Sequence, residues 1–445
     1  MFYDPEGIKA FKYSFPVFSA GGIGELLFMQ HSANLYPYFI QKEKLIVVRL
    51  KKPLRRLAKK VGNPIRKLRL GAKQTFGWLE TPKILPFRGF GNQDEICVRG
   101  MVLEDRGLAQ PEESDKIWQN ILAMYKRFKS DVIPGVQVKV TFYGYEEVVE
   151  TDEQGFFEAR FFLNGDISDE TAWHPVQIEL LDRIMVNQEP VVALGEVMIL
   201  QRESNFGIIS DVDDTILISH ATNTWKKFRL LMLKNAHTRL PFEGVAAFYR
   251  ALQEGKNCLC FNPIFFVSSS EWNLYDLLAD FCAVQGIPKG PFLLKTLKDD
   301  WYKVWKSGGG NHDHKLVKIR HILTTFHGLD FILIGDSGQH DAELYSQAVE
   351  EFPGRIKAIY IRDVSHNKRH REVQEIARTM HTKGVEMLVV ENTEAAAAHA
   401  IACGYIAHSA MESIKENRER DLEAPRQEGL SIEEEAPGKA LSTES

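Results

Sequence analysis

The residues of the chain with the clearest chemical potential lie in segment 207–216, where a short apolar run ends in Ser210 and two carboxylates follow. Asp211 and Asp213 stand at alternate positions, and Thr215 comes two residues later. An apolar run of this kind is typical of a buried strand in a parallel sheet, and open α/β sheets bind ligands beyond the carboxyl ends of such strands. Two acids this close need a cation or a shared proton, and a divalent metal is the simplest solution. One carboxylate could then act as a nucleophile while the other moves a proton; the alternative is helix capping by Asp and Thr.

A serine and a lysine further along the chain could hold a phosphate. Ser268 directly follows the apolar run 263–267, so its hydroxyl and the next backbone N–H groups could cradle phosphate oxygens, or simply cap a helix. Lys315 could offset phosphate charge and steady a nucleophile. Lys295 and Lys298 are weaker candidates for the same task.

Two further acids follow another apolar run that ends at position 334. Asp336 is placed to ligate a cation beside Asp211, and Asp341 could ligate the same ion or hold its water. Oxygen donors with room for water and a phosphate suit Mg2+. Zinc bound by His312 and His314 is a less favourable alternative, because a third clear ligand is missing from that segment.

The elements that must position these residues alternate between apolar strands and amphipathic helices from about residue 206 onwards. We expect strands at 207–210, 264–267, 292–294, 331–334, 356–361 and 385–390, and helices at 222–233, 244–252, 274–284, 315–324, 341–350 and 394–406. This alternation predicts a doubly wound α/β domain.

The preceding part of the chain is rich in short strands. We expect strands at 96–102, 136–142, 147–149, 157–161, 176–181 and 191–200, with a helix at 115–129. Short alternating strands at this spacing predict a small β-sandwich-like domain with a structural or docking role. The predicted organisation is a basic N-terminal region of unclear fold at 1–92, the β-rich domain at 93–203, the α/β domain at 204–408 and an acidic, disordered tail at 409–445. A helix that continues as far as Arg420 before the disorder begins is an alternative for the start of the tail.

Composition limits the functional classes. The chain has 445 residues, 44% of them hydrophobic and 26% charged, and its net charge of −5 gives no general attraction for nucleic acid. Five scattered cysteines favour a reducing compartment, and neither a secretory signal nor a membrane-spanning run is expected. We therefore expect a cytoplasmic protein, at most peripheral on a membrane. Segment 49–73 is basic and free of acids, so it could touch an anionic membrane surface or form a solvated linker.

The order of these signals resembles the haloacid dehalogenase superfamily of phosphotransferases. The resemblance implies that Asp211 is the nucleophile, which forms a transient aspartyl-phosphate, and that Asp213 protonates the leaving alkoxide and then activates water. It also implies that Thr215 and Ser268 hold the phosphoryl group, with Lys315 as the lysine of the third motif.

The same resemblance assigns a metal site to the chain. Asp336 and Asp341 are the acids of the fourth motif, and Mg2+ would bind Asp211, Asp336 and the backbone carbonyl of Asp213.

Longer strings are similar to one family within this superfamily, the phosphatidate phosphatases of the actin-patch-protein type. They are residues 210–216, 266–275, 314–315, 333–345 and 359–364, and the resemblance extends over about 205–405. The chain has Glu243, Glu271 and Ala342 where the family often has proline, which bears on loop shape and substrate preference.

The family resemblance implies hydrolysis of phosphatidate to diacylglycerol and phosphate. Two other functions stay open: a phosphatase of the same mechanism that acts on a soluble phosphomonoester or phosphoprotein, and a non-catalytic interaction module. The intact set of acids argues against the last. The sequence specifies no oligomeric state.

Overall fold

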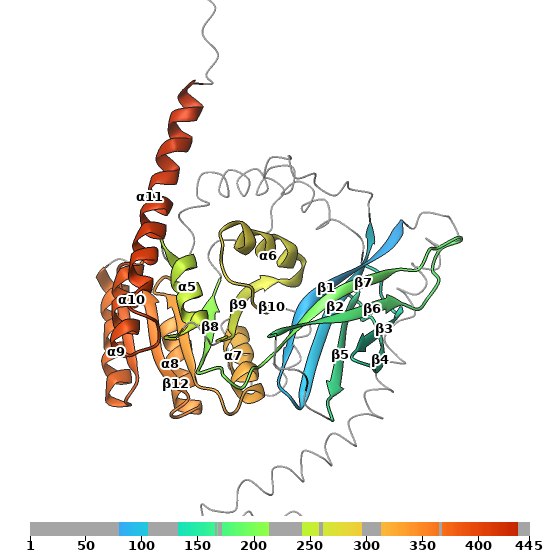
Figure 1. Ribbon diagram of the computed structural model, residues 1–445, viewed down its shortest axis with the longest axis horizontal. Helices are drawn as coiled ribbons and strands as arrows, with labels where there is room; N and C mark the ends of the chain where they lie inside the picture. Colours follow the sequence, from blue (N-terminus) through green and yellow to red (C-terminus); the bar gives the residue numbers. More distant parts are fainter. Residues whose placement is uncertain are drawn as a thin grey trace, which may run out of the picture. The chain divides into compact units, whose positions relative to one another are not determined.

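The protein contains two β-sheets, one antiparallel in character and one parallel (Figure 1). The computed structural model describes residues 80–105, 132–164, 167, 171–212, 243–257, 261–295, 313–364 and 367–434. The predicted helices at 115–129 and 222–233 and the basic segment 49–73 lie outside these ranges.

The first sheet has seven strands in the order β4-β3-β6-β7-β1-β2-β5. Its strands are β1 (Thr81–Gly91), β2 (Glu95–Asp105), β3 (Gln137–Phe142), β4 (Tyr145–Glu150), β5 (Phe156–Phe162), β6 (Trp173–Leu180) and β7 (Val192–Ile199). Their inward side chains, among them Val138, Val140 and Ile178, are fully buried in one core. The edge strands β4 and β5 contact each other, so the sheet curls around this core.

Two sequence predictions need correction in this sheet. The strands are hydrogen bonded as one sheet and not as the two separate sheets of a sandwich. The sheet also begins with β1, inside the region 1–92 to which no fold was assigned. β1 contains Pro82 and Pro86, and its register with β2 shifts between Phe87 and Phe90, so it lacks the strict alternation that marks a strand in sequence.

The second sheet has six parallel strands in the order β10-β9-β8-β11-β12-β13. They are β8 (Gly207–Asp211), β9 (Ile264–Glu271), β10 (Phe292–Lys295), β11 (Phe331–Asp336), β12 (Ile356–Arg362) and β13 (Glu386–Val390). The described helices are α5 (Val245–Glu254), the short 3-10 helix η1 (Trp272–Leu274), α6 (Tyr275–Val284), α7 (Asp313–Thr325), α8 (Asp341–Glu351), α9 (Asn367–Thr382), α10 (Thr393–Ala402) and α11 (Ala410–Glu434). The predicted mixed α/β character is confirmed.

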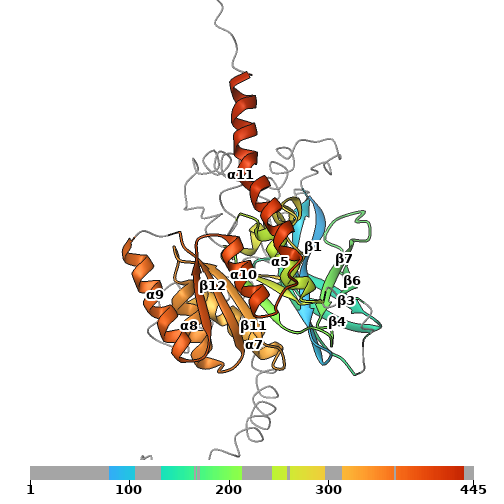
Figure 2. The same ribbon diagram turned by 60° about the vertical axis from the view of Figure 1, so that its left-hand side comes forward.

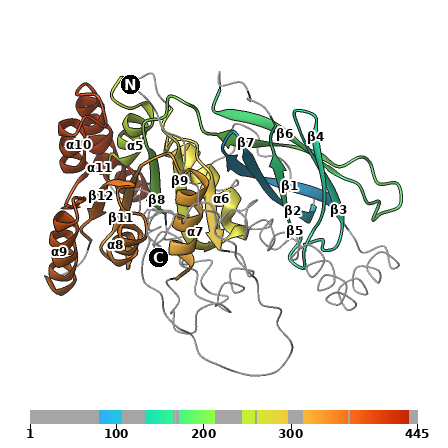
Figure 3. The same cartoon turned by 90° about the horizontal axis from the view of Figure 1, so that it is seen from below.

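Helices cover both faces of the parallel sheet. Helices α5, α6, α10 and α11 contribute to one apolar core, and α7, α8 and α9 contribute to the other. Figure 3 shows α5 and α10 on one side of β8, β11 and β12, with α7 and α8 on the opposite side. Because both faces are covered, β8 and β11 are almost entirely buried, which explains their continuous apolar sequences.

Helix α9 was absent from the sequence prediction. Strands β12 and β13 are parallel neighbours, so the chain between them must cross over a face of the sheet. Helix α9 makes this crossover and buries only a narrow stripe that includes Val373 and Met380. Its otherwise polar composition conceals the helical pattern.

The start of the tail is helical and not disordered, which agrees with the alternative of a helical extension, and the helix α11 continues beyond Arg420. Ile414 is fully buried, and Asn417 accepts a hydrogen bond from the backbone N–H of Ala247. Asp421 accepts a hydrogen bond of 2.7 Å from the backbone N–H of Gly244, which places a carboxylate at the N-terminus of α5, where the helix dipole favours it. Figure 2 shows α11 beside α5 and α10. None of the helices in the described ranges is both long and apolar enough to cross a bilayer.

Candidate active site at the ends of β8 and β11

The strand order creates a switch point between β8 and β11. From β8 the chain continues to β9 and β10 on one side, and β11 then returns to the other side of β8 and leads to β12 and β13. Connections that diverge in this way leave a crevice beyond the carboxyl ends of the two strands. Asp211 is the last residue of β8 and Asp336 is the last residue of β11, so both acids lie at the carboxyl edge of the sheet, on either side of this switch point.

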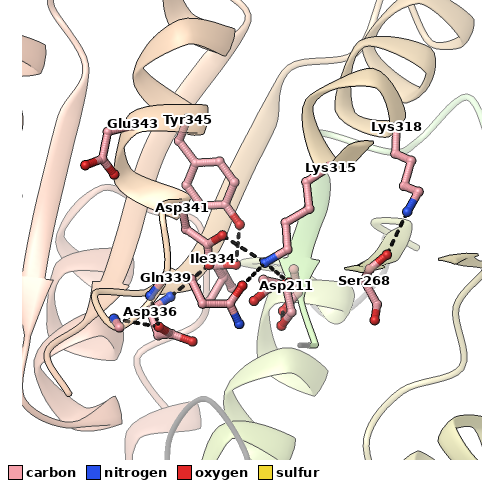
Figure 4. A network of polar contacts seen from close by, with 12 residues as sticks. Asp211, Ser268, Lys315, Lys318, Ile334, Asp336, Gln339, Asp341, Glu343 and Tyr345 are labelled. Atoms are coloured by element: carbon pink, nitrogen blue, oxygen red, sulfur yellow. Dashed lines mark hydrogen bonds and ion pairs between the residues drawn. The ribbon is translucent and has the colours of Figure 1, made fainter. Parts of the chain in front are cut away.

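Three carboxylates meet there. One side-chain oxygen from each of Asp211, Asp336 and Asp341 lies within 4.8 Å of the other two (Figure 4). Asp341 begins α8 and is fully buried, and its Oδ2 accepts a hydrogen bond of 3.2 Å from the backbone N–H of Asp336. A Cβ at Gly335 would lie 2.5 Å from that Oδ2, so only glycine permits this approach.

Lys315 places its ammonium group among these acids. Its Nζ lies 2.8 Å from Asp211 Oδ1 and 3.1 Å from Asp341 Oδ1, and it donates a hydrogen bond to Gln339 Oε1. The Lys315 side chain is only 6% exposed, so these contacts are poorly screened by water. Counted over these four described side chains alone, the three carboxylates carry −3 and the ammonium +1, which gives a formal charge of −2. A divalent cation with oxygen ligands fits this charge and these donors.

Ser268 lies close to the site, but not in the setting that was predicted. Strand β9 continues to Glu271 and is followed by η1, so Ser268 belongs to the strand and does not begin a helix. Its hydroxyl accepts a hydrogen bond of 2.9 Å from the backbone N–H of Ser270. Its carbonyl accepts a hydrogen bond of 2.7 Å from Lys318, a buried lysine one helical turn after Lys315. Lys318 was not predicted, although its spacing from Lys315 places it on the same side of α7.

The structure describes only some of the remaining candidate residues from the sequence. Asp213, Thr215, Lys298 and His312 lie outside the described residues. Lys295 ends β10, two strands away from β8, and the structure does not bring it into the cluster of acids through any hydrogen bond or ion pair among the described residues. His314 is buried next to Lys315 at the start of α7.

The loop that carries Asp336 and Asp341 is fastened by an arginine that sequence reasoning missed. Arg369 of α9 donates hydrogen bonds to the carbonyls of Ser337 and Gln339, and it forms an ion pair with Glu343. Burial alone would raise the pKa of Glu343, but the hydrogen bonds and charge of Arg369 outweigh it and hold that pKa below its ordinary value. Helix α9 therefore helps to hold this loop, in addition to strand β11, which leads into it.

Two buried tyrosines support the strand ends. The Tyr249 hydroxyl lies 2.6 Å from Ser210 Oγ, and Tyr345 donates a hydrogen bond of 2.8 Å to the carbonyl of Ile334. Burial raises the pKa of both phenols, and the nearby acids raise it further. Both hydroxyls therefore stay neutral and act as hydrogen-bonding supports.

Fold and site together define an α/β domain with a buried acid cluster at the carboxyl edge of its parallel sheet. Residues 206–363, which contain this cluster, match the family described as the catalytic domain of phosphatidate phosphatase APP1. This segment is therefore similar to that family, in agreement with its motifs.

Two relatives were compared over longer stretches. Phosphatidate phosphatase APP1 of Saccharomyces cerevisiae is 33% identical over 163 residues, and an uncharacterized protein of Schizosaccharomyces pombe is 25% identical over 271 residues. These alignments cover 36% and 59% of this chain, but only 26% and 40% of the two yeast proteins. Among solved structures, a carbohydrate acetylesterase from Xanthomonas citri aligns over 75% of this chain and 73% of its own, with 10% identity and a TM-score of 0.26. A score this low supports no conclusion about fold.

Proposed function

We propose that this chain is a Mg2+-dependent phosphatidate phosphatase that hydrolyses phosphatidate to diacylglycerol and phosphate. The observation that supports this proposal best is the meeting of three acids and Lys315 inside the segment that matches the phosphatase family. The same features favour a haloacid-dehalogenase-like domain, in which Asp211 forms an aspartyl-phosphate.

The donor set suits a hard divalent cation. Asp211, Asp336 and the backbone carbonyl of Asp213 would hold Mg2+, and Asp341 would ligate it or orient its water. When bound, the ion would offset negative charge on the phosphoryl oxygens. Both oxygens of Asp341 already contact other groups, namely Lys315 and the backbone N–H of Asp336, which favours the orienting role.

The chemical steps assign one task to each carboxylate. The Asp211 carboxylate attacks phosphorus, and the bond from phosphorus to the diacylglycerol oxygen breaks while Asp213 gives that oxygen its proton. Asp213 then takes a proton from water, and the hydroxide attacks the aspartyl-phosphate. This step releases phosphate and restores the Asp211 carboxylate. Thr215 and Ser268 hold the phosphoryl oxygens, and the Lys315 ammonium stabilises their charge.

The choice of a lipid substrate has its own support. It rests on the family match and on the basic segment 49–73, which would favour an anionic membrane surface. A phosphatase of the same mechanism could instead act on a soluble phosphomonoester or a phosphoprotein.

Phosphate release from phosphatidate vesicles, compared with a panel of soluble phosphomonoesters and phosphopeptides, tests both the mechanism and the lipid substrate. We expect release from the vesicles that stops when Mg2+ is chelated and returns when it is restored. Asp211→Asn should abolish release, because an amide does not attack phosphorus. Asp330→Asn is the matched control, since this acid lies just before β11 at the opposite edge of the sheet and pairs with Lys357.

Each outcome of this assay separates the alternatives. Turnover of soluble substrates alone would refute the lipid substrate but keep the mechanism. A chain inactive on every substrate, or an Asp211→Asn variant that is still active, would refute the catalytic proposal.

A further inference from the structure

A second group of potential metal ligands lies away from the catalytic acids. Glu386 is the first residue of β13, His399 lies near the end of α10, and Cys403 is the C-cap of the same helix. One ligand atom from each of the three lies within 4.8 Å of the other two. Glu386 begins a parallel strand whereas Asp211 ends one, so this group lies at the opposite edge of the sheet from the proposed active site.

The histidine ring is oriented as a metal-binding imidazole would be. Its Nε2 contacts the Glu386 carboxylate and lies 3.4 Å from the sulfur of Cys403. Its Nδ1 lies 2.9 Å from the hydroxyl of Tyr360, a fully buried residue of β12. If Nδ1 carries the ring proton and donates it to the Tyr360 oxygen, the lone pair of Nε2 faces the carboxylate, while the sulfur lies beside the ring, 4.0 Å from Nδ1. Ligand histidines are typically held by such a hydrogen bond on the far nitrogen.

An alternative explanation is a simple ion pair between Glu386 and His399 beside an unrelated thiol. This alternative accounts for the carboxylate contact but assigns no role to the Cys403 sulfur, which lies beside the ring at 3.4 Å from Nε2 and 4.0 Å from Nδ1. Cys403 follows His399 by four residues, so both side chains lie on one face of α10, and that face meets the first residue of β13. Sulfur, imidazole and carboxylate thus converge on one point from two elements.

We propose that Glu386, His399 and Cys403 form a second metal site, which takes a thiophilic divalent ion of the zinc class. Zinc accepts these three donor types, and a water would complete its tetrahedral coordination. Cys403 is exposed and the Glu386 side chain is 54% exposed, so the ion and its water have an open approach. The catalytic acids offer oxygen alone, so the two sites would select different metals.

Binding replaces protons by the metal. The Cys403 thiol gives its proton to the solvent and binds as a thiolate, and the proton on His399 Nε2, where present, leaves or moves to Nδ1. No change of oxidation state is involved. The bound ion would fasten the end of α10 to the start of β13, and so hold the last strand of the sheet.

Cobalt(II) is the probe for this site, because a cobalt–thiolate bond gives a charge-transfer band in the near ultraviolet that carboxylate ligands do not give. Titration of the 445-residue chain should produce a saturable band, and added Zn2+ should remove it. Cys403→Ser should abolish the band, and Glu386→Gln should weaken cobalt affinity. Tyr360→Phe should weaken it by about 10-fold, the effect typical of a lost partner of a ligand histidine. Glu375→Gln, which alters an exposed glutamate of α9, is the matched control for Glu386 and should change nothing.

A missing band in the wild-type chain, or a band that survives Cys403→Ser, would overturn the proposal. The second result would place the thiolate at another cysteine. Alkylation of the wild-type chain gives an independent measurement that needs no variant. Zn2+ should slow the reaction of Cys403 with iodoacetamide, as located by mass spectrometry of the digested protein, and an unchanged rate would refute the site. Neither measurement depends on phosphatase activity, so this proposal and the proposed function can fail separately.

Discussion

Replacement of Lys315 by methionine is the sharpest test of how the acid cluster is stabilised. The substitution keeps the length and the apolar stem of the side chain but removes the ammonium group. Two carboxylates, on Asp211 and Asp341, then lose a partner that lies 2.8 Å and 3.1 Å away. Because Asp211 is 5% exposed and Asp341 is fully buried, water cannot replace the lost charge without a rearrangement.

The size of the effect follows from these distances. At an effective dielectric constant of about 20, the two attractions amount to about 6 and about 5 kcal/mol. The penalty for desolvating the charges offsets much of this, so removing one partner of such a buried group lowers the free energy of unfolding by about 3–5 kcal/mol. The matched control is Lys357→Met, because Lys357 forms a partly exposed ion pair with Asp330. An exposed pair contributes at most about 1 kcal/mol.

Urea unfolding in the presence of a chelator would measure both variants. Adding Asp341→Asn to Lys315→Met removes one of the stranded charges and should recover part of the lost stability. Mg2+ should stabilise Lys315→Met more than the wild-type protein, because the variant site carries one more uncompensated negative charge. Equal urea midpoints for Lys315→Met and Lys357→Met would show that the ammonium does not compensate the buried acids.

Three further predictions concern Arg369, His321 and Gly335. Arg369→Leu should loosen loop 336–341 and raise the rate of hydrogen exchange of its backbone amides. It should also lower kcat by about 100-fold, the effect of displacing a catalytic group by about 1 Å. Unchanged hydrogen exchange would contradict the role of Arg369 in holding the loop. Burial, with two nearby arginines, lowers the pKa of His321 to about 4, so stability should fall as pH drops from 6.5 toward 4, because only the unfolded chain takes up the proton there. His321→Phe should remove about 2 kcal/mol of this pH-dependent change in the free energy of unfolding, a figure reduced from the value for the full pKa shift because the side chain is partly exposed. An unaltered dependence of stability on pH would contradict this role of His321. Gly335→Ala should displace Asp341, lower the free energy of unfolding by about 1–3 kcal/mol and reduce turnover, because the new Cβ would collide with the Asp341 side chain. A crystal structure of the variant with Asp341 unmoved would disprove this collision.

The central strands and their terminal acids could be predicted from sequence for a physical reason. Strands β8 and β11 are covered by helices on both faces, so they appear as unbroken apolar runs that end in a polar residue. Asp211 and Asp336 are those end residues, and parallel strands bring their carboxyl ends to one edge. The prediction of a shared site therefore required no knowledge of side-chain contacts.

The elements that were not predicted are defined by contacts between residues far apart in the sequence. β1 is recognisable only beside β2 and β7, because its register shift and prolines obscure its pattern. Helix α11 buries Ile414 in a largely charged segment, and backbone N–H groups at the start of α5 fasten it by donating hydrogen bonds to Asn417 and Asp421. Partners this remote in sequence leave no local signal.

The same distinction applies inside the site. Lys315 was found through its motif, but Lys318 and Arg369 were not, since each acts on a backbone carbonyl. Carbonyl acceptors are present at every position of the chain, so sequence cannot indicate which one a cation selects. Ser268 was predicted as a residue at the start of a helix because serine favours that position, whereas pairing between β9 and β10 extends the strand beyond it.

The energetics of the cluster argue that function, and not stability, explains its composition. Two buried carboxylates, a partly exposed third and one ammonium leave a net negative charge on these four side chains, and well-packed apolar side chains of similar volume would be as stable or more stable there. The fold nevertheless supplies specific supports for the charged groups, namely the close approach at Gly335 and the hydrogen bond from Tyr345 to the end of β11. Supports that maintain an unfavourable arrangement are expected where a cation and a phosphate complete it. Asp336→Ala and Asp341→Leu together should therefore raise thermal stability in the absence of metal while abolishing turnover, and a decrease in stability would mean that the acids serve the fold itself.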